Sequence, residues 1–205
     1  YMKKIVFIII LGLLWTTIPV EAQRRPGHRE QYEYSQGRPR LKYVIGHNAV
    51  LFDGKIIKGA SPARFKVLRD GYARDDWKVY YMGKAIKGAN SNSFKVLDNG
   101  YAKDSWDVYY HGSKIKGASS GSFKVLNGRY ARDAWDVYFK GMKIKGASPG
   151  SFKVLRDGYA CDAWNVYFNG DKIKGASPER FRILRDGYAE DGRNTYYLGR
   201  KVSRR

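Results

Sequence analysis

The chain has 205 residues, of which 15% are aromatic and 23 are glycine, and its formal net charge is +20 at pH 7. This length allows one medium-sized domain with a hydrophobic core, and the 43% of apolar and aromatic residues excludes a chain that is disordered throughout. The abundance of tyrosine and glycine favours short strands joined by tight turns over long helices.

Residues 1–22 have the pattern of a secretory signal peptide. Lys3 and Lys4 precede an apolar run at 5–15, and Val20 and Ala22 satisfy the small-residue rule for a cleavage site. A membrane anchor is the alternative, but the run is shorter than the roughly 20 residues of a membrane span. We therefore predict cleavage after Ala22, no transmembrane anchor after cleavage, and a periplasmic or secreted protein.

Residues 23–40 contain five arginines, two prolines and almost nothing to bury. This composition is typical of a disordered basic linker.

From residue 41 onward the sequence repeats with a period of 29 residues and no gap. Each copy carries a phenylalanine in the same place: Phe65, Phe94, Phe123, Phe152 and Phe181. Such a repeat predicts one tandem-repeat domain with degenerate copies at its ends. Its boundaries are 41–205, with a degenerate first copy at 41–59 and later copies at 60–88, 89–117, 118–146, 147–175 and 176–205.

Each copy reads as a meander of four very short strands. In one copy we predict strands at 94–97, 101–103, 106–110 and 114–116. Asn99-Gly100 is a strong hairpin signal, and Asp-Gly takes its place in other copies. In the segments before the phenylalanine, such as GASPERF and GANSNSF, a Ser or Asn followed by Pro fits an N-cap with proline at the first helical position, which predicts one helical turn.

Alternation along the third strand divides its side chains between two faces. Trp106, Val108 and Tyr110 share one face, which we assign to the core because Phe139 and Phe168 replace Tyr110 in later copies. The opposite face keeps its tyrosine in five copies: Tyr80, Tyr109, Tyr138, Tyr167 and Tyr196. A retained hydroxyl either forms a structural hydrogen bond or faces water. We take these tyrosines as candidate outward-facing ligand contacts.

Lysines recur at two positions of the repeat. One set is Lys66, Lys95, Lys124 and Lys153, and the other is Lys58, Lys87, Lys116, Lys145 and Lys174. In a tight β-helix these would form like-charge ladders at about 4.8 Å, which are destabilising. We therefore predict an all-β, open and curved array of hairpin units, with a closed propeller-like ring as the alternative.

The sequence offers little catalytic chemistry. It has no Cys/His metal spacing, no phosphate-binding loop and no nucleophile elbow, so we predict no metal and no cofactor. Cys161 stands where other copies have charged residues, and we interpret it as an incidental surface cysteine. Paired carboxylates are the remaining option: Asp104 with Asp107, and Asp75 with Asp76. A turn aspartate bonding local backbone is the favoured interpretation, and we predict that the protein is not an enzyme.

The string Y-A-x-D-x-x-x-V-Y-[YF]-x-G-x-K-I-K-G-A resembles the DKNYY family of bacterial envelope repeats, over 41–205. The family's aspartate is present five times: Asp75, Asp104, Asp133, Asp162 and Asp191. Its Lys-Asn pair is replaced by pairs such as Asp76-Trp77 and Ser105-Trp106. The resemblance implies an envelope location and no established activity.

The expected function is that of an exported, non-enzymatic envelope scaffold or interaction module, with an envelope protein as one class of partner. The alternative is a binder of anionic polysaccharide, lipopolysaccharide or another polyanion, without specific nucleic-acid recognition. Its contacts would come from the tyrosine row and from Lys66, Lys95, Lys124 and Lys153. A carboxylate-dependent hydrolase is a weaker alternative.

Overall fold

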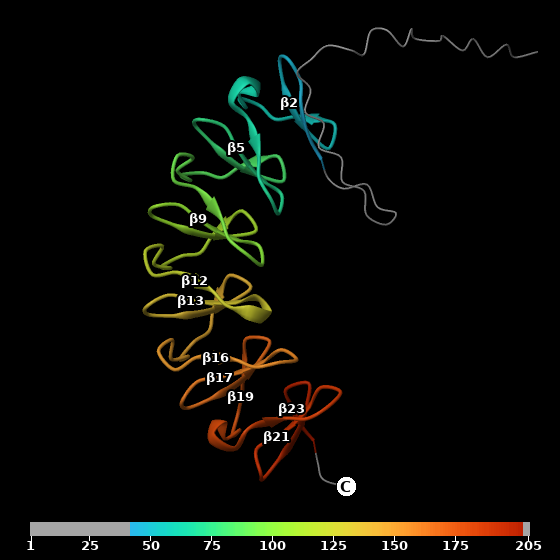
Figure 1. The fold of residues 1–205 in the computed structure, drawn as a ribbon, viewed down its shortest axis with the longest axis vertical. Coiled ribbons are helices and arrows are strands. Elements are labelled where there is room, and N and C mark those ends of the chain that lie inside the picture. Colours follow the sequence, from blue (N-terminus) through green and yellow to red (C-terminus); the bar gives the residue numbers. More distant parts are fainter. Residues whose placement is uncertain (1–41, 203–205) are drawn as a thin grey trace, which may run out of the picture. The chain divides into compact units, whose positions relative to one another are not determined.

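The computed structural model describes residues 42–202, which form six antiparallel β-sheets that follow one another in chain order (Figure 1). The predicted signal peptide and linker, at 1–22 and 23–40, lie outside the described residues. Strands adjacent in sequence pair with each other, so every sheet is a meander. The predicted all-β fold of open tandem repeats is confirmed, and the closed ring is not formed.

The first sheet has three strands and each later sheet has four. The first sheet contains β1 (Tyr43–Ile45), β2 (Val50–Phe52) and β3 (Lys55–Ile56). The second and third contain β4 (Lys66–Val67), β5 (Tyr72–Arg74), β6 (Val79–Tyr81), β7 (Lys84–Ala85), β8 (Lys95–Val96), β9 (Tyr101–Lys103), β10 (Val108–Tyr110) and β11 (Ser113–Lys114). The fourth and fifth contain β12 (Lys124–Val125), β13 (Tyr130–Arg132), β14 (Val137–Phe139), β15 (Met142–Lys143), β16 (Lys153–Val154), β17 (Tyr159–Cys161), β18 (Val166–Phe168) and β19 (Asp171–Ile173). The sixth contains β20 (Arg182–Ile183), β21 (Tyr188–Glu190), β22 (Thr195–Tyr197) and β23 (Arg200–Val202).

Tight hairpins keep the strands short. Between β8 and β9, Asn99 has φ 57° and Gly100 has φ 81°, which is the pattern of a type I′ turn. The hairpin between β10 and β11 has the same signature at His111 and Gly112. The hairpins predicted from Asn-Gly and Asp-Gly pairs are therefore confirmed.

The boundaries of several predicted elements need correction. The strand predicted at 94–97 is β8 (Lys95–Val96). The strand predicted at 114–116 is β11 (Ser113–Lys114), because a turn closed by the N–H of Ala118 and the carbonyl of Ile115 follows it. In the four copies that carry the tryptophan, the third strand begins at the valine and not at the tryptophan, as in β10, because the preceding residues form a turn around Asp104. The predicted helical turn is a 3-10 turn in two copies, η2 (Pro62–Arg64) and η4 (Pro178–Arg180). The serine before each of these turns makes no side-chain cap, so the predicted N-cap is wrong in these two copies. In the third sheet's copy, Oδ1 of Asn90 accepts the backbone N–H of Ser93 at 3.1 Å. A further 3-10 turn, η3 (Asn127–Arg129), lies in a hairpin.

The hydrophobic core is divided into clusters, one in each space between two neighbouring sheets. Between the third and fourth sheets, the buried cluster comprises Tyr101, Val108, Ile115, Phe123, Ala131 and Tyr138. The ring of Phe123, from the connecting segment, lies 5.5 Å from that of Tyr101 and 5.7 Å from that of Tyr138. An equivalent cluster fills each of the other four spaces between neighbouring sheets. The second to fifth sheets are therefore buried on both faces.

Candidate functional site

One buried aspartate organises the turn between the second and third strands of each four-stranded sheet. Oδ1 of Asp104 accepts the backbone N–H groups of Trp106 at 2.8 Å and Asp107 at 2.7 Å. Its Oδ2 accepts the backbone N–H of Asn90 and the hydroxyl of Tyr109, both at 2.9 Å. The same carboxylate pattern occurs at Asp75, Asp133, Asp162 and Asp191. The prediction that these aspartates bond local backbone in a turn is confirmed.

The hydrogen bonds keep each carboxylate ionised. Burial raises the pKa of Asp104, but the N–H groups of Asn90 and Asp107 and their neighbours outweigh it, so the net pKa lies below its usual value. Burial, and then the bond to Asp104, raises the pKa of the Tyr109 hydroxyl. The pair is therefore an ionised acceptor and a neutral donor at neutral pH. All four of the carboxylate's hydrogen bonds are to the protein itself, which makes Asp104 a structural residue.

The tyrosine row predicted to face outward is buried, and that prediction is wrong. The side chains concerned are fully buried: Tyr80, Tyr109, Tyr138, Tyr167 and Tyr196. Each hydroxyl donates to the aspartate five residues earlier in the chain. The physical reason is that the neighbouring sheet covers the face that we expected to meet water. Of the two roles open for a retained hydroxyl, the structure shows the structural hydrogen bond.

A second tyrosine row, which sequence reasoning left unassigned, joins neighbouring sheets. The hydroxyl of Tyr101 donates to the carbonyl of Arg129 at 3.1 Å and accepts the N–H of Gly141 at 3.0 Å. The same bridge recurs at Tyr43, Tyr72, Tyr130 and Tyr159. We call these five residues the bridging tyrosines. The sequence contained one signal for this role: the position of Tyr101 in the repeat is tyrosine in every copy and never phenylalanine.

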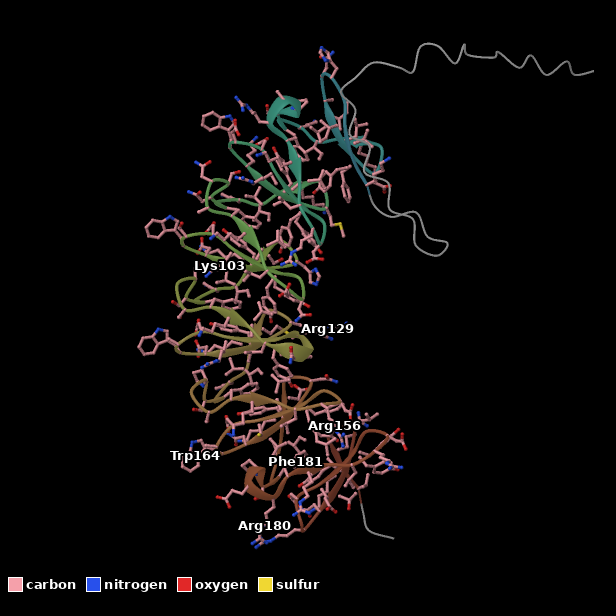
Figure 2. All side chains as sticks on the ribbon, viewed as in Figure 1. Lys103, Arg129, Arg156, Trp164, Arg180 and Phe181 are labelled. Atoms are coloured by element: carbon pink, nitrogen blue, oxygen red, sulfur yellow. The ribbon has the colours of Figure 1, made fainter. Side chains whose placement is uncertain are left out.

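The tryptophans predicted to lie in the core are instead the most exposed large apolar side chains of the repeat. The exposed fractions are 82% for Trp77, 78% for Trp106, 76% for Trp135 and 78% for Trp164. Figure 2 shows Trp164 projecting away from the ribbon at the edge of its sheet. Each tryptophan sits in the aspartate turn before the strand begins, so alternation along the strand does not determine its direction. The core assignment of Trp106 is wrong, whereas that of Val108 is confirmed and Tyr110 is partly buried.

Exposed lysines lie at the same end of each sheet as the tryptophan. Lys95 pairs across the strands with Lys103, which directly precedes the aspartate turn. The N–H of Ile115 bonds to the carbonyl of Val108, so the next residue, Lys116, reaches this end too. We call the end the tryptophan edge, defined by Trp77, Trp106, Trp135, Trp164 and by Lys66, Lys87, Lys95, Lys116, Lys124, Lys145, Lys153 and Lys174.

The lysines predicted as ligand contacts are exposed, as expected. Within residues 42–202, none of Lys66, Lys95, Lys124 and Lys153 forms an ion pair. Two acidic side chains near the edge are already paired: Asp107 with Lys114 and Asp136 with Lys143, each at 2.7 Å. The tryptophan edge therefore carries uncompensated positive charge.

The remaining candidates for chemistry are few in the described part of the chain. A shallow depression of ≈ 300 Å³ is lined by Tyr110, His111, Lys140 and Met142, among others, and by no carboxylate. His111 is bonded through Nδ1 to the Tyr81 hydroxyl at 2.7 Å. Cys161 is half-buried, and burial raises the pKa of its thiol. No group of three His, Cys, Asp or Glu residues between 42 and 202 could hold a metal ion, and no helix there is long and apolar enough to cross a membrane.

A family model described as the DKNYY family matches residues 72–200. No curated protein and no solved structure matches the chain.

Proposed function

The chain belongs to the DKNYY family, and from this premise and the geometry above we propose that it is a non-enzymatic interaction module that binds anionic polysaccharide at the tryptophan edge. The signal-like pattern of residues 1–22 supports a location outside the cytoplasm. Outside the cytoplasm, the anionic sugar ligands that such a module could bind are anionic polysaccharides and the phosphorylated glycan of lipopolysaccharide.

The observation that carries the proposal is the repetition of a rigidly held, exposed tryptophan. Large exposed apolar side chains are ordinary when scattered singly, but gathered in one surface they mark an interaction site. Here the aspartate turn holds the backbone N–H of each tryptophan, from Trp77 to Trp164. A side chain presented on a fixed backbone loses little entropy on binding. A row of such rings suits a repetitive, chain-like ligand, because each ring can stack on a successive unit.

The charge around each ring supports an anionic ligand. Lys95 lies directly opposite Lys103, and like charges opposite each other in a sheet are destabilising. The same opposition occurs between Lys66 and Arg74. Lys103 donates to the carbonyl of Ser120 at 2.8 Å, so a sulfate, phosphate or carboxylate group would bind at the exposed Lys95 and reduce the repulsion between the two cations. Neighbouring sheets stack at roughly 10 Å, so the sites repeat along the ligand and bind it multivalently.

The charge contribution is tested with two variants of equal net charge. One variant changes Lys66, Lys95, Lys124 and Lys153 to glutamine. The other changes four exposed cations away from the tryptophan edge: Lys55, Lys84, Lys140 and Arg200. Binding to immobilised heparin and to lipopolysaccharide is measured over a range of salt concentrations. We expect the first variant to lose affinity and to have a shallower salt dependence, while the second retains both. Equal loss in the two variants would mean that only overall charge matters and would refute the proposed site.

The tryptophan contribution is tested separately. Changing Trp77, Trp106, Trp135 and Trp164 to alanine leaves the charge unchanged, so the salt dependence should persist while affinity falls at least tenfold, about 1.4 kcal/mol. An unchanged affinity would show that the rings do not contact the ligand. Comparing heparin with lipopolysaccharide distinguishes a free polysaccharide from a lipid-linked glycan as the preferred ligand.

A further inference from the structure

Every space between neighbouring sheets is built from the same two faces. The forward face of a sheet carries a bridging tyrosine and faces the next sheet, as Tyr101 and Val108 do in the third sheet. The backward face carries the alanine and the aspartate-bonded tyrosine, as Ala131 and Tyr138 do in the fourth sheet. Forward face meets backward face five times between the first sheet and the last.

Two contacts fasten each forward face to its backward face. In one of them, Tyr72 accepts the N–H of Gly112 and donates to the carbonyl of Gly100. In the other, the side chain of Tyr81 lies on Gly112, so close that a Cβ on that glycine would come within 2.5 Å of it. Both contacts depend on a glycine in the hairpin of the following sheet.

Within residues 42–202, the forward face of the last sheet has no such partner. Tyr188 occupies the position of the bridging tyrosines, yet it is 43% exposed, whereas four of them are fully buried: Tyr72, Tyr101, Tyr130 and Tyr159. Tyr197, the equivalent of Tyr81, is 42% exposed. The two rings lie 4.7 Å apart and form an aromatic surface with nothing from residues 42–202 docked on it.

The backward face of the first sheet is unusually apolar, and nothing from residues 42–202 covers it. Val44 is 44% exposed and Ile56 is 66% exposed. Ile56 stands where later copies have Ala85, Lys114, Lys143, Lys172 and Lys201. Gly54 is the counterpart of Gly112, but a Cβ built there would meet nothing within 4 Å. An end repeat that meets only water needs a polar outer face, whereas this end carries aliphatic side chains.

We propose that the forward face of the last sheet docks on the backward face of the first sheet of a second copy of this chain. The interface would bring together the same two faces that meet five times within each copy, without the phenylalanine that a connecting segment supplies there, such as Phe123 between the third and fourth sheets. Tyr197 would lie on Gly54 of the second copy, and Tyr188 would accept the Gly54 N–H. Two different faces meet, so the contact is heterologous and extends head to tail. Association is independent of polysaccharide binding, because the tryptophan edge takes no part in it.

Sedimentation of the full chain, from low to high micromolar concentration, tests the proposal. The wild-type chain should form species of increasing mass. Val44→Arg blocks the backward face and Tyr197→Arg blocks the forward face, so each variant alone should be a monomer. Met142→Arg, at an exposed residue away from both faces, is the control and should associate like the wild type.

Mixing the two blocked variants gives the decisive result. Each variant keeps the face that the other lacks, so the mixture should form dimers and nothing larger. Far-UV circular dichroism and thermal melting verify that both variants remain folded. A wild-type monomer at all concentrations, association of either blocked variant alone, or a mixture that stays monomeric would each overturn the proposal. A monomer is also the result expected if residues 1–41 cover either face.

Discussion

Asp75 and Asp76 are adjacent carboxylates with different surroundings. Changing each in turn to asparagine measures how much the aspartate turn contributes to the free energy of unfolding. Asp75 is 2% exposed and accepts the N–H groups of Trp77, Lys78 and Ser61 and the hydroxyl of Tyr80. In Asp75→Asn an amide NH2 replaces one oxygen and faces two of these four donors. Hydrogen bonds to a charged group contribute about 1.5–3 kcal/mol each. The expected loss in the free energy of unfolding is therefore about 3–6 kcal/mol.

Asp76→Asn removes the same charge from an exposed side chain. The carboxylate of Asp76 is 57% exposed and lies 3.7 Å from the guanidinium of Arg64, which is 72% exposed. Such surface pairs contribute about 0–1 kcal/mol. The substitution therefore controls for charge and chain position while leaving the turn intact.

Urea unfolding followed by far-UV circular dichroism measures the difference. With an m-value of about 2 kcal/mol/M, Asp75→Asn should lower the midpoint by about 1.5–3 M and Asp76→Asn by less than about 0.5 M. Hydrogen exchange locates the effect, because the amides of Trp77 and Lys78 should lose protection only in Asp75→Asn. Equal midpoint shifts in the two variants would refute the argument that the four hydrogen bonds stabilise the turn.

Three other predictions follow from the same structure. Tyr101→Phe removes the bridge to the fourth sheet and should cost about 1–3 kcal/mol, whereas Tyr110→Phe, at a position where other copies have phenylalanine, should change the melting temperature little. Gly112→Ala should destabilise the protein more than Gly117→Ala, by about 1–3 kcal/mol. Both glycines have positive φ, but only at Gly112 would the new Cβ meet Tyr81, and thermal melting compares the two. Protein stability should fall at both extremes of pH, as circular dichroism and tyrosinate absorbance can record. The pKa values of the turn aspartates are lowered in the folded protein. The resulting stabilisation is therefore present above about pH 3.9, the usual pKa of aspartate, and is lost as the pH falls through the folded-state pKa values. Burial raises the pKa of Tyr101 to about 12, so its contribution is complete below about 10 and is lost as pH rises through about 12. Gradual tyrosine ionisation without unfolding would contradict the predicted loss of stability at alkaline pH.

Local sequence patterns predicted the repeat architecture well. The 29-residue period and the Asn-Gly and Asp-Gly pairs led to hairpin meanders, because backbone conformation at such turns depends on the two residues themselves. The same holds for Asp104, whose bonds reach residues two and three positions later in the chain. Features set by neighbouring residues were accessible from the sequence.

Features that depend on how neighbouring sheets stack could not be predicted from the sequence. Alternation separates Val108 from Tyr109 but does not say whether the second face meets water or another sheet, and here both residues are fully buried. The alternation also does not determine where a strand begins, and for this reason Trp106 was wrongly assigned to the core. A pairing of Asp104 with Tyr109, repeated five times, was a signal of structural bonding that the tyrosine column alone did not provide.

The bridging tyrosines have a mechanical consequence. Each one ties a sheet to the next sheet along the chain, and the hydrogen bonds between sheets have this nearest-neighbour form. Under tension applied to the two ends, such a protein should yield one copy at a time. Each event would release a segment of 29 residues, on the order of 100 Å of extended chain. A force–extension record would then be a regular sawtooth, and the chain would behave as an extensible spacer that lengthens in steps before it breaks.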